Sequence, residues 1–440
     1  MQIDREFLYE FFAILNKKYN YAVLRGYEEL PDNFKSHDID ILIPKNEYKR
    51  LKKDINHLLH QFKFQLLLVN ENERFHTIVI AKRINNELQF LYIDFFFNYS
   101  LYGVELLDAN TVLNRRVFNK KVYHVLLMDE FLEKYLNTSL LNVKYPEKYK
   151  YIYEDIFNNE KKNVESILST VFDDNSIQIE TLQQINGKKM LIKAFIANIR
   201  NKPLHQLKLS ISFVFYYLKG VLFSNGFSFS MTGPDGSGKT TLLTELEQIF
   251  SEVYREVKLY HFRPTVIPRI AELFKKSGLK KEVDENYDKP HRGGKTSKAS
   301  SWFRLFYYIL DYIIGYYKVV KPVLFRRGVV IFDRYYTDII SDSKRSRIYL
   351  NYKTIFMLRK LVPSMDYNFI IFVDPEKILQ RKQELTREQI DDIYEKLNYI
   401  CKNDTQYTPI TNDNDPQEAV NAILDHILEK QDIKYRKYFK

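Results

Sequence analysis

The stretch Gly233-Pro234-Asp235-Gly236-Ser237-Gly238-Lys239-Thr240 decides the fold of the second half of the chain. Two glycines separated by four residues, and followed by lysine and threonine, have the Walker A spacing of a phosphate-binding loop. The apolar segment 227–231 precedes the loop, and apolar residues recur at helical spacing after it, from residue 240 to residue 250. Because the motif requires a loop between a strand and a helix, this context predicts a nucleotide-binding site.

The residue types in this loop suit phosphate. Glycines allow backbone N–H groups to turn toward phosphate oxygens, and the N-terminus of the following helix adds positive potential. We expect Lys239 to lie between the β- and γ-phosphates and the Thr240 hydroxyl to bind Mg²⁺. The predicted cofactors are therefore ATP and Mg²⁺. The residues expected to bind ATP are Gly233, Asp235, Gly236, Ser237, Gly238, Lys239, Thr240 and Thr241.

A second charged element, Asp333-Arg334-Tyr335, follows the apolar segment 329–332. Ligands of open α/β sheets bind at the carboxyl ends of strands, so we expect Asp333 and Arg334 to point toward the phosphate loop. Asp333 would hold Mg²⁺ or its water, and Arg334 would bind the phosphate under attack. The alternative is an ion pair that only closes the end of a strand.

A third charged segment follows Asp374-Pro375-Glu376 and contains Arg381 and Arg387. Arginines on a helix at this place would fold over the transferred phosphoryl group as a lid that excludes water and neutralises developing charge. A solvated charged helix is the alternative that composition alone leaves open.

The pattern of apolar segments predicts an α/β fold class. After residue 226, five predicted strands are separated by helices, which indicates a parallel sheet flanked by helices. The first third predicts mixed α/β structure, and 128–218 is mainly helical. We therefore expect a mixed α/β domain at 1–127, a mainly helical connector at 128–222 and a P-loop domain at 223–440.

Roughly residues 223–430 resemble the thymidylate kinase family of P-loop kinases. The resemblance rests on the phosphate loop, on Asp333-Arg334-Tyr335 and on Val373-Asp374-Pro375-Glu376 before the basic lid. It implies that Asp235 contacts the sugar hydroxyl of a nucleotide and that Arg334 binds the acceptor phosphate.

Two features depart from that family. The family's Arg-Glu-Pro is here His261-Phe262-Arg263-Pro264, and the segment 275–298 is longer and more polar than a nucleoside monophosphate site requires. In these respects the chain is more similar to the thymidylate kinase-like proteins found with cell-surface polysaccharide genes. That resemblance implies a small phosphorylated acceptor, with Arg263 and Arg304 as further contacts to it.

A weaker motif lies near the N-terminus, where His37-Asp38-Ile39-Asp40-Ile41 alternates so that Asp38 and Asp40 point to one face of a strand. Asp94 ends the apolar segment 91–93. Acids in apolar strands need a cation or several donors, so these three carboxylates are candidate catalytic groups and ligands of a pair of Mg²⁺ ions.

Residues 15–125 resemble the nucleotidyltransferase superfamily, in which a Gly-Ser turn precedes such a strand. Gly26 stands at the turn, as a predicted substrate contact, and Tyr27 stands in place of the serine. The resemblance leaves two hypotheses: nucleotidyl transfer, or a degenerate domain that binds a nucleotide or phosphosugar without turnover.

The net charge is +11, and it is unevenly placed. No acid lies between Glu180 and Asp235, whereas seven cations do: Lys188, Lys189, Lys193, Arg200, Lys202, Lys208 and Lys219. The apolar run 209–218 is too short for a bilayer span, which needs about twenty residues. We interpret the stretch as a basic helical connector, and the alternative is an interfacial helix on an anionic membrane. A nucleic-acid surface is less favoured, since no nucleic-acid-binding motif accompanies it.

The charged start of the chain predicts no export signal, and a single cysteine, Cys401, fits a reducing compartment. We expect a cytoplasmic protein, with the inner face of the membrane as a further location. The oligomeric state is left open, with a dimer among the candidates.

The first functional hypothesis is phosphoryl transfer from ATP to a nucleotide or to a sugar or polyol phosphate, coupled to nucleotidyl transfer in the synthesis of a surface-glycan precursor. The alternative is a nucleotidyltransferase directed at nucleic acid or protein, with a regulatory P-loop domain, in a stress or defence response.

Overall fold

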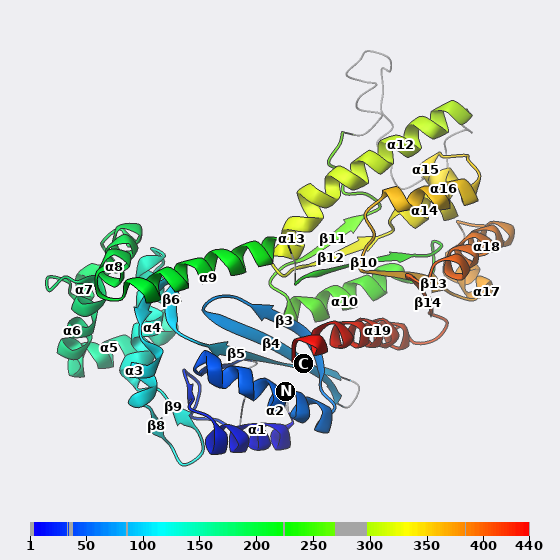
Figure 1. Cartoon of the computed structure of the whole chain (residues 1–440). Coiled ribbons are helices and arrows are strands. Elements are labelled where there is room, and N and C mark those ends of the chain that lie inside the picture. The colour runs from blue at the N-terminus through cyan, green and yellow to red at the C-terminus, as the bar shows by residue number, and fades with distance from the viewer. Residues whose placement is uncertain are drawn as a thin grey trace. The chain divides into compact units, whose positions relative to one another are not determined.

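The computed structural model describes residues 4–32, 34, 38–84, 87–222, 225–268, 297–382 and 384–439. Its contacts divide the chain into two compact units. Unit 1 comprises residues 1–220 and 428–440, and unit 2 comprises residues 221–427 (Figure 1). Residues 275–296 of the segment predicted to shape the acceptor site lie outside the described residues.

Unit 1 is built on a mixed seven-stranded sheet with the order β3-β4-β5-β2-β1-β9-β8. The alternation of apolar residues in the sequence matches these strands, and the α/β class predicted for this region is confirmed. The strands of unit 1 are β1 (Ala22–Val23), β2 (Asp38–Leu42), β3 (Gln65–Glu71), β4 (Phe75–Ile84), β5 (Glu87–Phe96), β6 (Tyr99–Leu101), β7 (Val104–Leu107), β8 (Val117–Phe118) and β9 (Tyr123–His124), with β6 and β7 forming a separate hairpin.

The helices after residue 126 share a core with this sheet. Phe131, Leu168 and Ala194 from the helices belong to one buried cluster with Leu42 and Phe96 from the strands. The contacts therefore place residues 128–220, which the sequence predicted as a separate connector, in unit 1. The helices are α1 (Arg5–Lys18), α2 (Lys45–Gln61), α3 (Ala109–Asn114), α4 (Leu127–Leu140), α5 (Lys150–Asn159), α6 (Lys161–Phe172), α7 (Ile179–Leu182), α8 (Gly187–Asn201) and α9 (Pro203–Leu222), which ends in unit 2.

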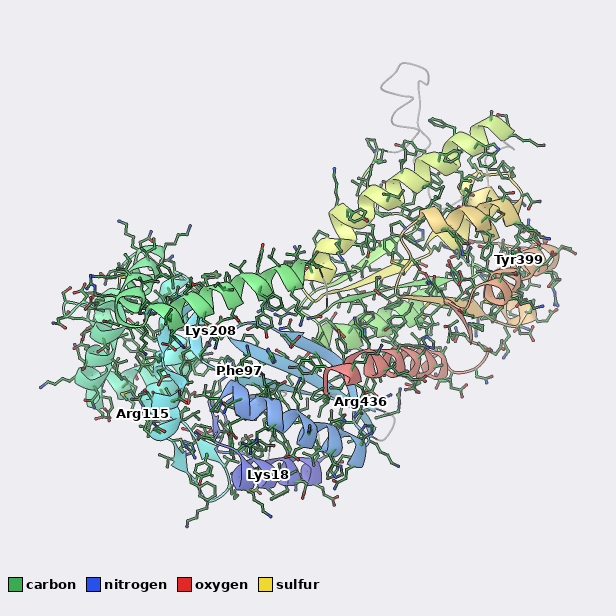
Figure 2. All side chains as sticks on the ribbon, viewed as in Figure 1. Lys18, Phe97, Arg115, Lys208, Tyr399 and Arg436 are labelled. Carbon is green, nitrogen blue, oxygen red and sulfur yellow. The ribbon has the colours of Figure 1, made fainter. Side chains whose placement is uncertain are left out.

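Residues 428–440 also belong to unit 1, although the sequence placed them with the P-loop domain. Asp432 accepts a hydrogen bond from the backbone N–H of Leu66 (2.8 Å). Arg436, labelled in Figure 2, donates to the carbonyl of Phe64 (2.8 Å). The Tyr438 hydroxyl lies 2.6 Å from Nδ1 of the buried His76. Polar and aromatic contacts at several points thus fix the C-terminal segment on unit 1.

Unit 2 is a five-stranded parallel sheet with the order β11-β12-β10-β13-β14. The predicted parallel sheet flanked by helices is confirmed (Figure 1). Its strands are β10 (Phe227–Thr232), β11 (Val257–His261), β12 (Val329–Asp333), β13 (Tyr367–Phe372) and β14 (Tyr407–Thr411). Its helices are α10 (Lys239–Val253), α12 (Lys298–Gly315), α13 (Lys321–Phe325), α14 (Tyr336–Ser341), α15 (Ser343–Ser346), α16 (Tyr352–Leu358), α17 (Pro375–Arg381), α18 (Arg387–Asn403) and α19 (Pro416–Arg436), which ends in unit 1.

The central strand β10 is buried along its whole length, including its two serines and its threonine. β10 and its neighbour β12 are parallel, so their carboxyl ends meet at one edge of the sheet. The phosphate loop leaves β10 at that edge and Asp333 ends β12 beside it. The topology therefore brings the two charged motifs of the sequence together.

His76 makes the stability of unit 1 depend on pH. Burial, followed by the nearby Lys45, Lys52 and Lys219, lowers the pKa of His76 to about 3. In the unfolded chain histidine has a pKa of about 6.5, so below that pH the unfolded state binds a proton that the folded state excludes. We expect the free energy of unfolding to fall as pH drops below about 6.5, by up to about 1.4 kcal/mol per pH unit from this group.

Urea unfolding between about pH 7 and about pH 5 measures this effect, with His76→Phe as the test and the exposed His57→Asn as the matched control. The His76→Phe chain should lose less stability than the wild type over this range, and the control should behave like the wild type. An equal pH dependence in all three chains would contradict the assignment.

Candidate active site

The phosphate loop connects β10 to α10. Two of its glycines adopt left-handed backbone angles, which favour glycine over other residues. Gly236 has φ 86° and Gly238 has φ 82°. A Cβ at Gly238 would lie 2.6 Å from the side-chain nitrogen of Asn412, which itself donates to the carbonyl of Ser237 (2.9 Å). Both backbone angle and space therefore require glycine at position 238.

Lys239 is buried in this loop, with 6% of its surface exposed. Its Nζ donates to the carbonyl of Pro234 (2.8 Å) and to the hydroxyl of Ser237 (3.4 Å). Burial, followed by the neighbouring Arg334, lowers the pKa of Lys239 to about 7. A phosphate anion would exchange with these weak internal partners and restore the full charge of the ammonium group.

Arg334 joins the end of β12 to the phosphate loop. It has φ 70°, and its backbone N–H donates to the carbonyl of Met231 on β10 (2.9 Å). Its guanidinium is buried, donates to Asp338 (2.6 Å) and pairs with Asp235. Burial tends to lower the pKa of Arg334, but Asp338 and Asp235 outweigh burial and raise it. Arg334 is therefore a fixed cation at the loop.

Arg345 is a functional candidate that sequence reasoning missed. It lies on the short helix α15, and its guanidinium pairs with Asp235 and with Asp342 (3.3 Å). Asp235 thus lies between two arginines: burial tends to raise its pKa, but Arg334 and Arg345 lower it overall. The position of Arg345 depends on the turn between α14 and α15, for which the sequence offered one signal, the helix-capping Asp342.

Asp333 and Thr240 supply oxygen ligands that fit Mg²⁺. Oδ2 of Asp333 lies 2.9 Å from Nδ1 of His261. Oδ1 of Asp333 is buried and accepts no hydrogen bond from the described residues. Burial tends to raise the pKa of Asp333, but His261 and Lys239 lower it overall, so the carboxylate is ionised. A carboxylate oxygen that is ionised and accepts no hydrogen bond from the described part of the chain, beside the phosphate loop, suits a divalent cation.

A cavity of about 390 Å³ brings most of these residues together. Its lining residues are Asp235, Gly236, Gly238, Lys239, Thr240, Thr241, His261, Asp333, Arg334, Arg345, Arg381 and Lys382. Five of these side chains are basic and two are acidic, so the described lining is strongly cationic. Polyphosphate is a ligand with matching charge.

Five of the site residues predicted for unit 2 lie outside this lining. Gly233 and Ser237 lie beneath the loop surface and are buried. Arg263 is held by the buried Asp311 (2.9 Å) and stacks near Tyr308. Arg387 pairs with Glu376 (2.6 Å) and Asp391. Arg304 is half-buried on α12.

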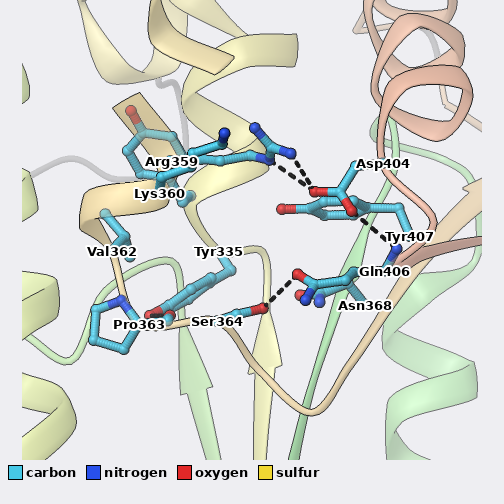
Figure 3. A pocket seen from close by; sticks show the side chains of 11 residues that line it. Tyr335, Arg359, Lys360, Val362, Pro363, Ser364, Asn368, Asp404, Gln406 and Tyr407 are labelled. Atoms are coloured by element: carbon cyan, nitrogen blue, oxygen red, sulfur yellow. Dashed lines mark hydrogen bonds and ion pairs between the residues drawn. The ribbon is translucent and has the colours of Figure 1, made fainter. Parts of the chain in front are cut away.

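A second cavity, of about 430 Å³, lies in unit 2 beside the N-terminal ends of β13 and β14 (Figure 3). Its polar groups are largely paired within the protein: Arg359 with Asp404, and Ser364 with Gln406 (3.2 Å). It contains none of the predicted phosphate-binding residues. Size alone therefore does not identify the site, and the cationic cavity is the better candidate.

Unit 1 holds the second predicted site. Asp40 lies opposite Asp94 in the parallel pair β2–β5, and Asp38 lies two residues away on β2. The carboxylate of Asp40 is 1% exposed and pairs with Arg25, and burial raises the pKa of Asp40 to about 7. Among the described residues there is no group of three or more His, Cys, Asp or Glu placed to hold a metal ion. As they stand, these residues do not fit a pair of Mg²⁺ ions.

In the turn before this strand, Gly26 adopts a left-handed backbone angle, as suits a glycine at a tight turn. Gly26 has φ 65°, and the ring of Tyr27 stacks on His124 at a centroid distance of 3.9 Å. The residue that replaces the family's serine is therefore packed against β9.

The fold and loop of unit 2 define a P-loop domain, and one family model matches most of this unit. The thymidylate kinase family model matches residues 231–425, so this region is thymidylate kinase-like and of the phosphotransferase class. No curated protein matches the chain. A thymidylate kinase structure from Ehrlichia chaffeensis is 24% identical, covering 46% of this chain and 98% of its own, with a TM-score of 0.31. That from Candida albicans is 18% identical, covering 47% and 93%, with a TM-score of 0.34.

Substitution of Gly238 tests the geometry of the loop. Gly238→Ala places a side chain in the left-handed region, at a cost of about 1–2 kcal/mol, and against Asn412. We expect ATP binding, measured by calorimetry, to weaken at least about tenfold.

The double variant Gly238→Ala/Asn412→Ala relieves the contact but retains the backbone strain, and Ser251→Ala, late in α10, is the matched control. Unchanged ATP affinity in Gly238→Ala would show that the loop does not bind the ligand in this conformation.

Proposed function

We propose that the C-terminal domain transfers the γ-phosphoryl group of ATP to a small phosphorylated acceptor. The observation that carries this proposal is the buried Lys239 in a Walker A loop, facing a cavity that Arg334, Arg345 and Arg381 also line. Asp235 and Asp333 offset only part of the positive charge of this lining, and close cations repel one another where no anion lies between them. An ATP tail and an acceptor phosphate supply that negative charge.

Phosphoryl transfer requires mainly that the protein positions the reactants and stabilises the developing charge, and it requires little proton transfer by the protein. The loop amides and Lys239 would hold the β- and γ-phosphates, and Arg334 would orient the acceptor phosphate. Asp333 and Thr240 would hold Mg²⁺, which neutralises phosphate charge when it is bound. Arg381 lines the cavity and would cover the transferred group, with Arg387 stabilising the lid from outside through Glu376.

The acceptor is proposed to be a nucleotide or a sugar or polyol phosphate used in a surface-glycan precursor. Asp235 can accept hydrogen bonds from ligand hydroxyls, and Arg345 adds a second guanidinium beside it. The replacement of Arg-Glu-Pro by residues 261–264, with Arg263 engaged by Asp311, supports an acceptor other than thymidylate.

A second candidate function belongs to unit 1, and the register of Asp40 opposite Asp94 favours it. We propose that this domain binds a nucleotide or phosphosugar, with Arg25 neutralising Asp40. Incubation with α-labelled nucleoside triphosphates tests the nucleotidyl transfer predicted from the sequence. Incorporation that Asp40→Asn abolishes would establish transfer, whereas saturable binding without incorporation would establish a binding domain.

Lys239→Ala tests the kinase proposal. Loss of the ammonium group removes stabilisation of the transferred charge, so ATP turnover with a panel of sugar, polyol and nucleoside monophosphates should fall at least about a hundredfold. Circular dichroism should show an intact fold. Lys258→Ala, on the exposed side of β11, is the matched control. Turnover in Lys239→Ala equal to that of the control would remove the kinase proposal.

Arg345→Ala tests the acceptor side of the site. A charged hydrogen bond contributes about 1.5–3 kcal/mol, so KM for the acceptor should rise at least about tenfold while KM for ATP stays the same. Steady-state kinetics with each substrate varied in turn separates the two. The control is Arg326→Ala, whose surface pair with Glu256 lies away from the cavity. Equal rises in both KM values would mean that Arg345 only supports the loop.

A further inference from the structure

Helix α9 exposes a row of large apolar side chains. The helix, which the structure describes in full, buries one residue, Gln206. Seven large hydrophobic residues of its unit 1 portion are more than half exposed; apart from Tyr217, they are Leu204, Leu207, Ile211, Val214, Phe215 and Leu218. At about 100° per residue these six fall within an arc of roughly 100°, so they form one continuous stripe, here called the α9 stripe.

The opposite face of α9 is fixed to the β6–β7 hairpin. The Gln206 amide donates to the carbonyl of Gly103 (2.6 Å), and Asn198 on α8 donates to the carbonyl of Glu105 (2.7 Å). Rotation of the stripe into the core would break the buried bond of Gln206. The stripe is therefore a stable outer surface of unit 1.

The sequence from 181 to 234, which includes the stripe, contains several lysines and arginines and no aspartate or glutamate. Lys193, Arg200, Lys202 and Lys219 pair with carboxylates from other segments. The exposed Lys188, Lys189 and Lys208 have no carboxylate partner among the described residues. Lys208, labelled in Figure 2, follows Leu204 by four residues and precedes Ile211 by three, so it borders the stripe.

An apolar stripe bordered by a lysine, in a stretch of sequence without acids, matches a surface that is apolar inside and anionic outside. None of the helices in the described ranges has the length and hydropathy of a membrane span. A helix of this length lying flat would extend over roughly 30 Å. Its leucine, isoleucine and phenylalanine side chains would enter the acyl region while Lys208 reaches the headgroups.

We propose that the α9 stripe, bordered by Lys208, binds unit 1 to the surface of an anionic phospholipid bilayer. This contact is separate from the cationic cavity of unit 2 and does not depend on the kinase proposal. It would hold the protein at a membrane without crossing it.

Cosedimentation of the full chain with vesicles tests the proposal. The protein should bind phosphatidylglycerol-rich vesicles at least about tenfold more tightly than pure phosphatidylcholine vesicles, and salt should weaken the binding. The stripe variant Leu207→Ser/Ile211→Ser/Leu218→Ser should reduce binding at least about tenfold. The charge variant Lys208→Gln should weaken the preference for anionic lipid.

The matched control is Met357→Ser/Leu361→Ser, which removes two exposed apolar side chains of unit 2. It should bind vesicles like the wild type. Circular dichroism checks that each variant is folded, since all substituted side chains are exposed. Absence of vesicle binding by the wild type, or equal binding by the stripe variant, would overturn the proposal. A change from oligomer to monomer in the stripe variant, without any vesicle binding, would assign the stripe to a second copy and would also overturn it.

Discussion

The candidate site depends on one constraint, the placement of a buried ammonium group inside a loop of glycines. Among the described residues, Lys239 donates to the carbonyl of Pro234 and the hydroxyl of Ser237 alone, and burial lowers its pKa to about 7. The loop keeps this arrangement because Gly236 and Gly238 adopt left-handed angles and Asn412 holds the carbonyl between them. A phosphate tail would bind to amides and to a cation that are already in place.

The parallel sheet sets the rest of the site around this loop. β10 and β12 are neighbours, so their carboxyl ends bring Asp333 and Arg334 beside Lys239. Arg345 arrives from α15 and completes the pair of arginines around Asp235. Unit 1 neutralises its own buried acid with Arg25 against Asp40. Both units therefore pair buried charges internally, but in unit 2 the described cavity lining keeps more basic than acidic side chains.

Much of the fold could be predicted from local pattern. Helix α1 is determined locally, since its apolar residues recur at helical spacing and the Asp4 side chain caps its first turn. The phosphate loop could be predicted because glycine, lysine and threonine must stand at fixed spacing. The packing of residues 428–440 on unit 1 could not be predicted from local pattern, because it depends on a contact between Tyr438 and His76, which are far apart in the sequence. Arg345 and the pairing of Arg263 with Asp311 were missed for the same reason: long-range contacts decide which arginine is engaged.

The central claim is that the loop around Lys239 recognises a polyphosphate tail. Isothermal titration calorimetry of the wild-type chain with Mg²⁺ present, comparing ATP with AMP, tests it most directly. The account predicts one ATP site per chain that binds ATP at least about a hundredfold more tightly than AMP, since the β- and γ-phosphates make the contacts with the loop. Equal affinity for the two nucleotides, or no heat of ATP binding to well-folded protein, would contradict it.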